Sequence, residues 1–166
     1  MEDWIVPALQ RFSNDTAALA QLRRGLGKNY DECVEIWQYI TPMGNSNAKQ
    51  ENALFYTFTL FAMHQQGQTK LVHQEGSDLG VACRNLTLDE RSSQSLKNRF
   101  LNTARSDSQD ELIQHLQGLI SILRSKDIPL DYKDLYYAIY YWDDSLKRAR
   151  KRRIWAHHFY LIPSVK

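Results

Sequence analysis

The run KRARKRR, from Lys147 to Arg153, contains six basic residues in seven positions and no acid. It lies between two aromatic segments, YYAIYYWDD before it and IWAHHFYLI after it, which a disordered basic arm would lack. The flanks therefore predict a packed helix that carries a fixed row of cations. Such a row suits a polyanion, of which nucleic acid is the most common. The alternative is a solvated helix face without a ligand, although such faces usually mix both signs of charge.

Two further groups of basic residues occur earlier in the chain. Arg23, Arg24 and Lys28 follow a stretch of strong helix formers, so they would project from a helix end onto phosphates. The alternative is that they only complement the helix dipole, which favours cations at a C-terminus. The other group is spread over the middle of the chain and comprises Arg84, Arg91, Lys97, Arg99 and Arg105.

The histidines and acids do not form a recognisable catalytic or metal-binding pattern. The sequence contains no HExxH, nucleophile elbow, P-loop or dinucleotide-binding fingerprint. The adjacent His157 and His158 would point about 100° apart on a helix, so they are poorly placed to share a metal ion. In the pair Asp143-Asp144, the second carboxylate is expected to balance Arg148 one turn later. The sequence therefore predicts no enzyme, no metal site and no cofactor.

Length and composition are those of an ordinary globular protein. The 166 residues are 43% hydrophobic and 24% charged, with a net charge of +2, which predicts one domain, or two small lobes that share a core. Cys33 and Cys83 stand in apolar surroundings, so we expect two buried, reduced thiols. The N-terminus is acidic where a signal peptide is basic, and no stretch approaches the ~20 apolar residues of a membrane span. We therefore expect a soluble, cytoplasmic protein without membrane contact.

The elements that must position the basic residues carry helical signals throughout. Sustained alternation and hairpin dipeptides are absent, so the fold class is predicted to be all-α, a compact bundle of about seven or eight helices. Helix start signals occur at Asn14-Asp15, Asp31, Ser77-Asp78, Asp89 and Ser108. The segment 51–66 is apolar nearly all round and is expected at the centre of the core. The polar stretch 69–76 is expected to be exposed, and 68–76 is the candidate boundary between two lobes.

The aromatic and basic segments at the end are predicted to form one long helix from Asp131 to about Ile162, roughly 45 Å long. Its apolar stripe would comprise Leu135, Ile139, Trp142, Leu146 and Ala149. The opposite face would carry Lys147, Arg148, Lys151 and Arg152. We expect Arg148 and Lys151 to face a partner, because they lie farthest from the stripe. Arg153 falls on the stripe, where it would pair with an internal acid or lay its stem along the core.

Several short motifs, taken in order, resemble those of one known family. They are ALAQLRRGLGK, SDLGVACRNL, NRF at Asn98–Phe100, LRSKDIPLDYKDL and WDD followed by RRIWAHHFY. Each motif alone is weak, but their order and spacing are similar to those of the CasB family, the small subunit of the type I-E CRISPR surveillance complex Cascade. The resemblance extends from about Ala17 to Tyr160.

The resemblance implies a non-catalytic, all-helical subunit. Two copies of such a subunit would lie head to tail in the complex, beside its backbone and large subunits, and help to hold target DNA opened by the guide RNA. Arg23 and Arg24 match the family's LRRG arginines, and Arg99 matches the arginine before its phenylalanine. Many members carry arginine where this chain has Val81, and Arg84, one turn later, is the candidate substitute.

Taken together, the residues and the resemblance predict a Cascade subunit that binds the nucleic-acid backbone and stabilises the R-loop. The predicted contacts are Arg23, Arg24, Lys28, Arg84, Arg99, Arg105, Lys147, Arg148, Lys151 and Arg152. Two alternatives remain. One is a helical interaction module that meets an acidic protein and no nucleic acid, and the other is a small helical enzyme such as a nuclease.

Overall fold

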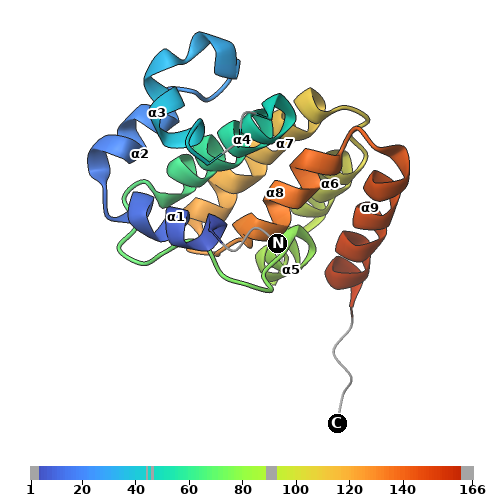
Figure 1. The fold of residues 1–166 in the computed structure, drawn as a ribbon. Helices are drawn as coiled ribbons and strands as arrows, with labels where there is room; N and C mark the ends of the chain where they lie inside the picture. Colours follow the sequence, from blue (N-terminus) through green and yellow to red (C-terminus); the bar gives the residue numbers. More distant parts are fainter. Residues whose placement is uncertain (1–3, 44, 46, 89–92, 162–166) are drawn as a thin grey trace.

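The computed structural model describes residues 4–43, 45, 47–88 and 93–161, and all of its regular elements there are helical (Figure 1). The described α-helices are α1 (Ile5–Ser13), α2 (Thr16–Arg23), α3 (Trp37–Ile40), α4 (Ala48–Gln65), α5 (Leu79–Leu86), α6 (Ser93–Ala104), α7 (Gln109–Ser125), α8 (Tyr132–Tyr141) and α9 (Ser145–Tyr160). Two 3₁₀ turns, η1 (Tyr30–Glu32) and η2 (Val34–Ile36), precede α3. The prediction of an all-α fold is confirmed.

The centre of the fold is α4, as its apolar sequence predicts. It packs against α1, α2, α7 and α8, and its Phe55, Phe58 and Phe61 are fully buried. One connected cluster of buried apolar residues runs from Ile5 in α1 to Phe159 in α9. This continuity favours one domain over two lobes, which stays a prediction. None of the helices in the described residues has both the length and the apolar composition that a membrane span requires.

Asp15, Asp78 and Ser108 cap helices as predicted, whereas Asp31 lies within η1 rather than at a helix start. The side chains of Asp15, Asp78 and Ser108 accept hydrogen bonds from backbone N–H groups in the first turns of α2, α5 and α7. These bonds satisfy donors that a helix start leaves unpaired. Asp89, the predicted cap of the following helix, lies outside the described residues.

Two N-terminal segments differ from expectation. The segment DECVEIWQYI, predicted as one helix, forms η1, η2 and the four-residue α3. Its conformation is fixed by tertiary contacts, because Trp37 Nε1 donates to the Tyr30 carbonyl at 2.8 Å and the Tyr30 and Thr41 hydroxyls lie 2.8 Å apart. Helix α1 was not predicted, although Pro7 lies in its first turn, where a missing N–H is tolerated.

The predicted long C-terminal helix is wrong, because the chain turns between α8 and α9. Trp142 is fully buried and donates from Nε1 to the Ser106 carbonyl at 2.9 Å. Asp144 then starts a new helix by accepting hydrogen bonds from the backbone of Leu146 and Lys147, which also lower the pKa of its carboxyl. The turn changes the faces of the second half, so Leu146, expected in the apolar stripe, is 81% exposed.

The segment 68–76 between α4 and α5 is only partly exposed. Val72 is buried, and the Gln65 side chain donates to the Lys70 carbonyl and accepts from the Val72 N–H. Leu130 N donates to the Val72 carbonyl at 2.9 Å in a single parallel bridge. These contacts hold the segment against the chain that leads into α8.

Both cysteines are buried and free of a disulfide, as predicted. Cys83 lies in α5 and Cys33 links η1 and η2. Burial raises the pKa of both thiols, which keeps them protonated and unreactive at neutral pH.

Candidate nucleic-acid interface

The basic helix α9 is held against α5 by a close backbone approach (Figure 1). Gly80 in α5 allows this approach, since a Cβ atom built there would lie 2.1 Å from the Trp155 carbonyl oxygen. His158 Nδ1 hydrogen-bonds the Asp78 carboxylate, and Arg84 donates to the His158 carbonyl at 3.0 Å. The motif SDLG therefore fixes the position of α9.

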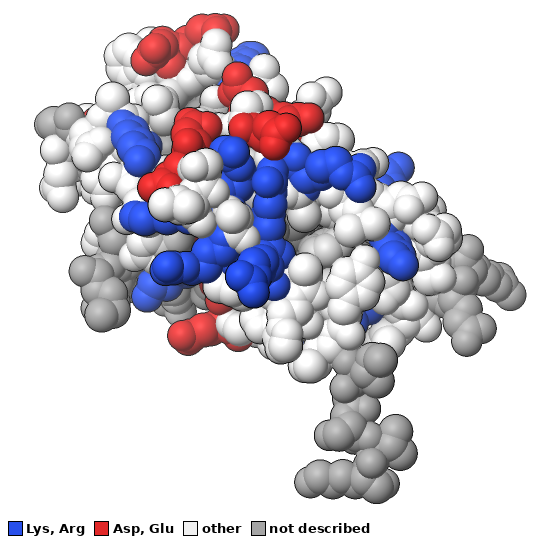
Figure 2. All heavy atoms as spheres, turned by 90° about the vertical axis from the view of Figure 1, so that its right-hand side faces the viewer, with Lys and Arg blue, Asp and Glu red and all other residues white. Residues whose placement is uncertain are grey.

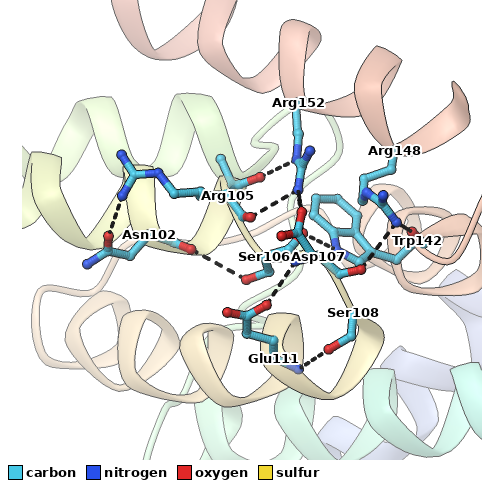
Figure 3. Close-up of polar contacts among 10 residues, drawn as sticks. Asn102, Arg105, Ser106, Asp107, Ser108, Glu111, Trp142, Arg148 and Arg152 are labelled. Carbon is cyan, nitrogen blue, oxygen red and sulfur yellow. Dashed lines mark hydrogen bonds and ion pairs between the residues drawn. The ribbon is translucent and has the colours of Figure 1, made fainter. Parts of the chain in front are cut away.

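Arg152 caps the C-terminus of α6 (Figure 3). Its guanidinium donates to the carbonyl oxygens of Ala104, Arg105 and Ser106 and lies 3.2 Å from the Asp107 carboxylate. The last carbonyls of a helix have no partner within the helix, and a cation also interacts favourably with the dipole there. Arg152 therefore joins α9 to α6.

Arg148 and Lys151 are also engaged within the fold. Arg148 donates to the Trp142 carbonyl at 2.8 Å and to the Asp107 carbonyl at 3.3 Å (Figure 3). Lys151 Nζ lies 2.6 Å from the Asp134 carboxylate, which also accepts from Trp155 Nε1. Arg148 and Lys151 were expected to face a partner, but the turn at 142–144 rotates them towards α8 and the 104–107 loop. Their contact with nucleic acid stays a prediction. Asp144 was expected to balance an Arg or Lys one turn later, and the cation that does so is Lys147 rather than Arg148. Besides the backbone hydrogen bonds, the Lys147 charge also lowers the pKa of the Asp144 carboxyl.

The outward face of α9 carries Lys147, Arg150 and Arg153 instead. All three are exposed, and among the described residues Arg150 and Arg153 have no hydrogen bond or ion pair. Lys147 Nζ lies 3.6 Å from the centroid of the Tyr141 ring, which leaves its charge near the surface. The expectation that Arg153 lies along the core or pairs with an internal acid is therefore wrong.

The face that carries α9 is strongly basic. Figure 2 shows Lys and Arg side chains gathered in one band on this face, with most of the visible acidic side chains along its upper edge. Carboxylates pair with Lys151 and Arg152 at this face, whereas Lys147, Arg150 and Arg153 keep their charges exposed. Exposed charge of one sign is the feature expected of a surface that attracts a polyanion.

Arg99 in α6 and Arg105, the residue directly after α6, extend the basic surface away from α9. Both are exposed, and Arg105 donates to the Asn102 side chain at 3.0 Å. Arg99 and Asn102 line a polar cavity of about 520 Å³ between α6 and α7, together with His115. The carbonyl of Arg105 accepts from Arg152, which joins the end of α6 to α9.

Arg23, Arg24 and Lys28 are not brought together with α9. They lie in and after α2, on the opposite side of the molecule from α9 (Figure 1). Arg24 and Lys28 line a small cavity with Glu32 and Glu35, so carboxylates partly neutralise them. Arg23 is in the last turn of α2, where it complements the helix dipole. Their role in nucleic-acid binding stays a prediction.

Arg84 does not extend from α5 as a free cation. Its bond to the His158 carbonyl caps the end of α9, and Val81, three residues before it, is half-buried. Arg84 therefore fixes the position of α9, and its role as a substitute for the family's arginine at Val81 stays a prediction.

The histidines do not assemble a metal centre in the described part of the chain, where no three potential ligands of the types His, Cys, Asp and Glu come together. His64 is buried between the Tyr132 hydroxyl and the Ile128 carbonyl, at 2.8 and 2.9 Å. Burial lowers its pKa to about 4, so it is neutral at pH 7 and serves the core.

One protein-family model matches most of the chain. The model for CRISPR-associated protein Cse2 matches residues 18–160. The chain belongs to the Cse2 family. The matched residues of this chain run from α2 to the end of α9, so they include every basic group described above.

Solved structures agree with the Cse2 assignment. CasB from Thermobifida fusca is 27% identical, with a TM-score of 0.79 over 96% of this chain and 95% of that chain. A Cse2-family protein from Thermus thermophilus is 22% identical, with a TM-score of 0.77 over 96% and 97% of the two chains. A chain of a CRISPR RNA-guided surveillance complex is 22% identical, with a TM-score of 0.77 over 95% and 90%. No curated protein gave a match. The resemblance to CasB that the motifs suggested is confirmed.

Sequence reasoning missed Arg150 and Arg153 as exposed cations. The signal that was available is the triplet Asp143-Asp144-Ser145, since aspartate followed by a helical stretch is a common helix start. The new helix starts at Ser145. Lys147, Arg150 and Arg153 lie along one of its faces, because they are spaced three residues apart.

Proposed function

We propose that this Cse2-family chain is a non-catalytic subunit of the cytoplasmic Cascade surveillance complex and holds opened target DNA by its phosphates. The contacts would be Lys147, Arg150 and Arg153 of α9, together with Arg99 of α6 and Arg105 directly after α6. The observation that carries the proposal is a row of exposed cations, of which Arg150 and Arg153 have no partner in the described residues, on a helix that the fold holds in place. Because the helix is already ordered, binding need order only the side chains and not the backbone that carries them.

Contacts to phosphates suit the function of such a subunit. Replacing a DNA duplex by a guide–target hybrid is nearly balanced in free energy, so modest backbone contacts tip it towards the open state. Phosphate contacts read no sequence, and sequence is supplied by the guide. A few contacts bind free DNA weakly, and assembly with the other subunits raises the effective concentration.

A protein partner is the second candidate for the same helix. Leu146, Ile154, Tyr160 and Leu161 are exposed on α9 or just after it, and exposed apolar groups of this kind favour a protein contact. The two roles are compatible if one part of α9 meets another subunit, or a second copy of this chain, and another part meets DNA. A purely protein-binding helix would show no binding to nucleic acid even at low salt.

Co-purification tests the proposal. The chain is expressed with the neighbouring Cascade genes and a guide RNA, and the purified complex is compared with one prepared without the chain. We expect stoichiometric co-elution and weaker target-DNA binding when the chain is omitted. A chain that stays outside the complex would overturn the proposal.

Incubation of the full chain with DNA or RNA and a divalent metal ion tests the remaining alternative, a small helical enzyme. Cleavage of the nucleic acid would indicate a nuclease.

A further inference from the structure

Between α8 and α9 there is a pocket that combines apolar and aromatic side chains with four Lys and Arg residues. Its volume is about 280 Å³, and its lining includes Tyr137, Tyr141, Trp142 and Ile154. This volume is just below the ~300–1,000 Å³ of pockets that hold drug-sized ligands, so it suits a single small ring system. Tyr137 and Tyr141 are four residues apart in α8, which places both rings on the same face of the helix.

The remainder of the lining is cationic. Lys147 and Arg150, the exposed cations of α9, line the same pocket, and Lys147 lies over the Tyr141 ring. Arg148 also lines it, and its Nε is buried without a hydrogen-bond partner among the described residues. A buried donor without an acceptor is uncommon in native structures and marks a place where a ligand acceptor would be favourable.

An apolar, aromatic cavity with cations beside it matches the two halves of a nucleotide. A base stacks on aromatic rings by its π-face, and its phosphates pair with lysine and arginine. An acidic peptide with an aromatic side chain has similar chemistry. The nucleotide is favoured because the cations beside the pocket continue the α9 row that the proposed function assigns to the DNA backbone.

We propose that the pocket between α8 and α9 receives one unstacked base of a single strand while Lys147 and Arg150 contact its phosphates. The inference rests on the proposed function, since it adds a base contact to the same backbone-binding face. The pocket has few polar atoms to read a base edge, so any base would be accepted, with purines favoured by their larger stacking surface.

Two short DNA strands of equal length and charge test this inference with the full chain at low salt. One strand carries bases throughout, with 2-aminopurine at its centre, and the other is abasic. We expect the intact strand to bind at least about fivefold more tightly, the low end of what stacking of one base contributes, and 2-aminopurine fluorescence to fall on binding.

Variants locate the base contact. The double variant Tyr137→Leu with Tyr141→Leu keeps apolar volume but removes both rings. We expect it to bind the intact strand as weakly as the abasic strand, with an unchanged affinity for the abasic strand. Tyr160→Leu, which removes an exposed ring of α9 outside the pocket, should leave the preference unchanged. Circular dichroism and thermal unfolding establish that each variant is folded.

The experiment distinguishes failure of the pocket assignment from failure of the proposed function. Equal binding of intact and abasic strands by the unmodified chain would overturn the pocket assignment and leave the proposed function standing. Absence of binding to either strand, alone and in the assembled complex, would overturn both. An acidic, phenylalanine-containing peptide that binds the unmodified chain but not the double variant, without any base preference for DNA, would assign the pocket to a protein.

Discussion

The arginines of the 147–153 run have two different roles at the residue scale. Arg148 and Arg152 donate to main-chain carbonyls, so their charges are used to join α9 to α8 and α6. Arg150 and Arg153 are exposed and have no partner in the described residues. Arginines only one or two positions apart are therefore expected to differ: replacing Arg148 or Arg152 should lower stability, and replacing Arg150 or Arg153 should weaken binding.

Replacing Arg152 by methionine should destabilise the protein. The change leaves the carbonyls at the end of α6 without their donor, which costs about 1–3 kcal/mol in the free energy of unfolding. Arg153→Met is the matched control, and it should alter the free energy of unfolding by less than about 0.5 kcal/mol. Urea denaturation of both variants measures the difference. Equal stability of the two would contradict the structural role of Arg152.

His64 should make the protein less stable in mild acid. Its pKa is about 4 in the fold against 6.5 for the unfolded chain, because burial disfavours the charged imidazole. The unfolded state therefore binds more protons between these values, and stability is lost as pH falls from about 6.5 towards 4. A shift of this size corresponds to about 3 kcal/mol. Burial lowers the pKa of His73 too, which adds to the loss in the same direction.

The comparison with a His64→Gln variant isolates this contribution. Glutamine retains a donor and an acceptor but does not titrate, so the fall in the free energy of unfolding between pH 7 and pH 5 should be smaller in the variant. The readout is the pH dependence rather than the absolute stability, because the substitution itself disturbs the buried site. The same pH dependence in both proteins would show that the fold does not lower the pKa of His64.

At the scale of elements, the regular helices were predictable and the connections between them were not. Caps such as Asp15, Asp78 and Ser108 are local signals, and the structure uses all three. The turn at 142–144 depends on Trp142 reaching the Ser106 carbonyl, a contact between residues 36 positions apart. Periodicity within one segment contains no such information, so the helical wheel placed Arg148 and Arg153 on the wrong faces.

The contact between α5 and α9 should be intolerant of a larger residue at Gly80. In Gly80→Ala the new Cβ would lie 2.1 Å from the Trp155 carbonyl oxygen, so the two helices must separate. We expect a loss of about 3 kcal/mol in the free energy of unfolding, at the upper end for an overpacked site. Gly118→Ala is the control, because its Cβ would meet only the Arg99 side chain at 3.6 Å. Thermal or urea unfolding distinguishes the two, and equal effects would contradict the close approach.

At the scale of the whole molecule, the fold presents one basic face and orients it by internal contacts. A net charge of +2 gives no indication of this face, because acids elsewhere nearly balance the total. The basic band is a property of the folded surface (Figure 2), to which the contact of Arg152 in α9 with the end of α6 contributes. The cations of α2 lie on the opposite side (Figure 1), so a single strand that follows the α9 face would not reach them without other subunits.

The measurement that tests the central claim most directly is the salt dependence of target-DNA binding by the assembled complex. We compare three complexes. They contain the unmodified chain, the double variant Arg150→Gln with Arg153→Gln, or the control variant Arg11→Gln on the far helix α1. The double variant should assemble normally and bind several-fold more weakly at low salt. Its slope of log affinity against log salt should be reduced by about 0.7 for each lost phosphate contact, while Arg11→Gln changes neither quantity. An unchanged slope and affinity in the double variant would contradict the claim that the outer face of α9 holds the DNA backbone.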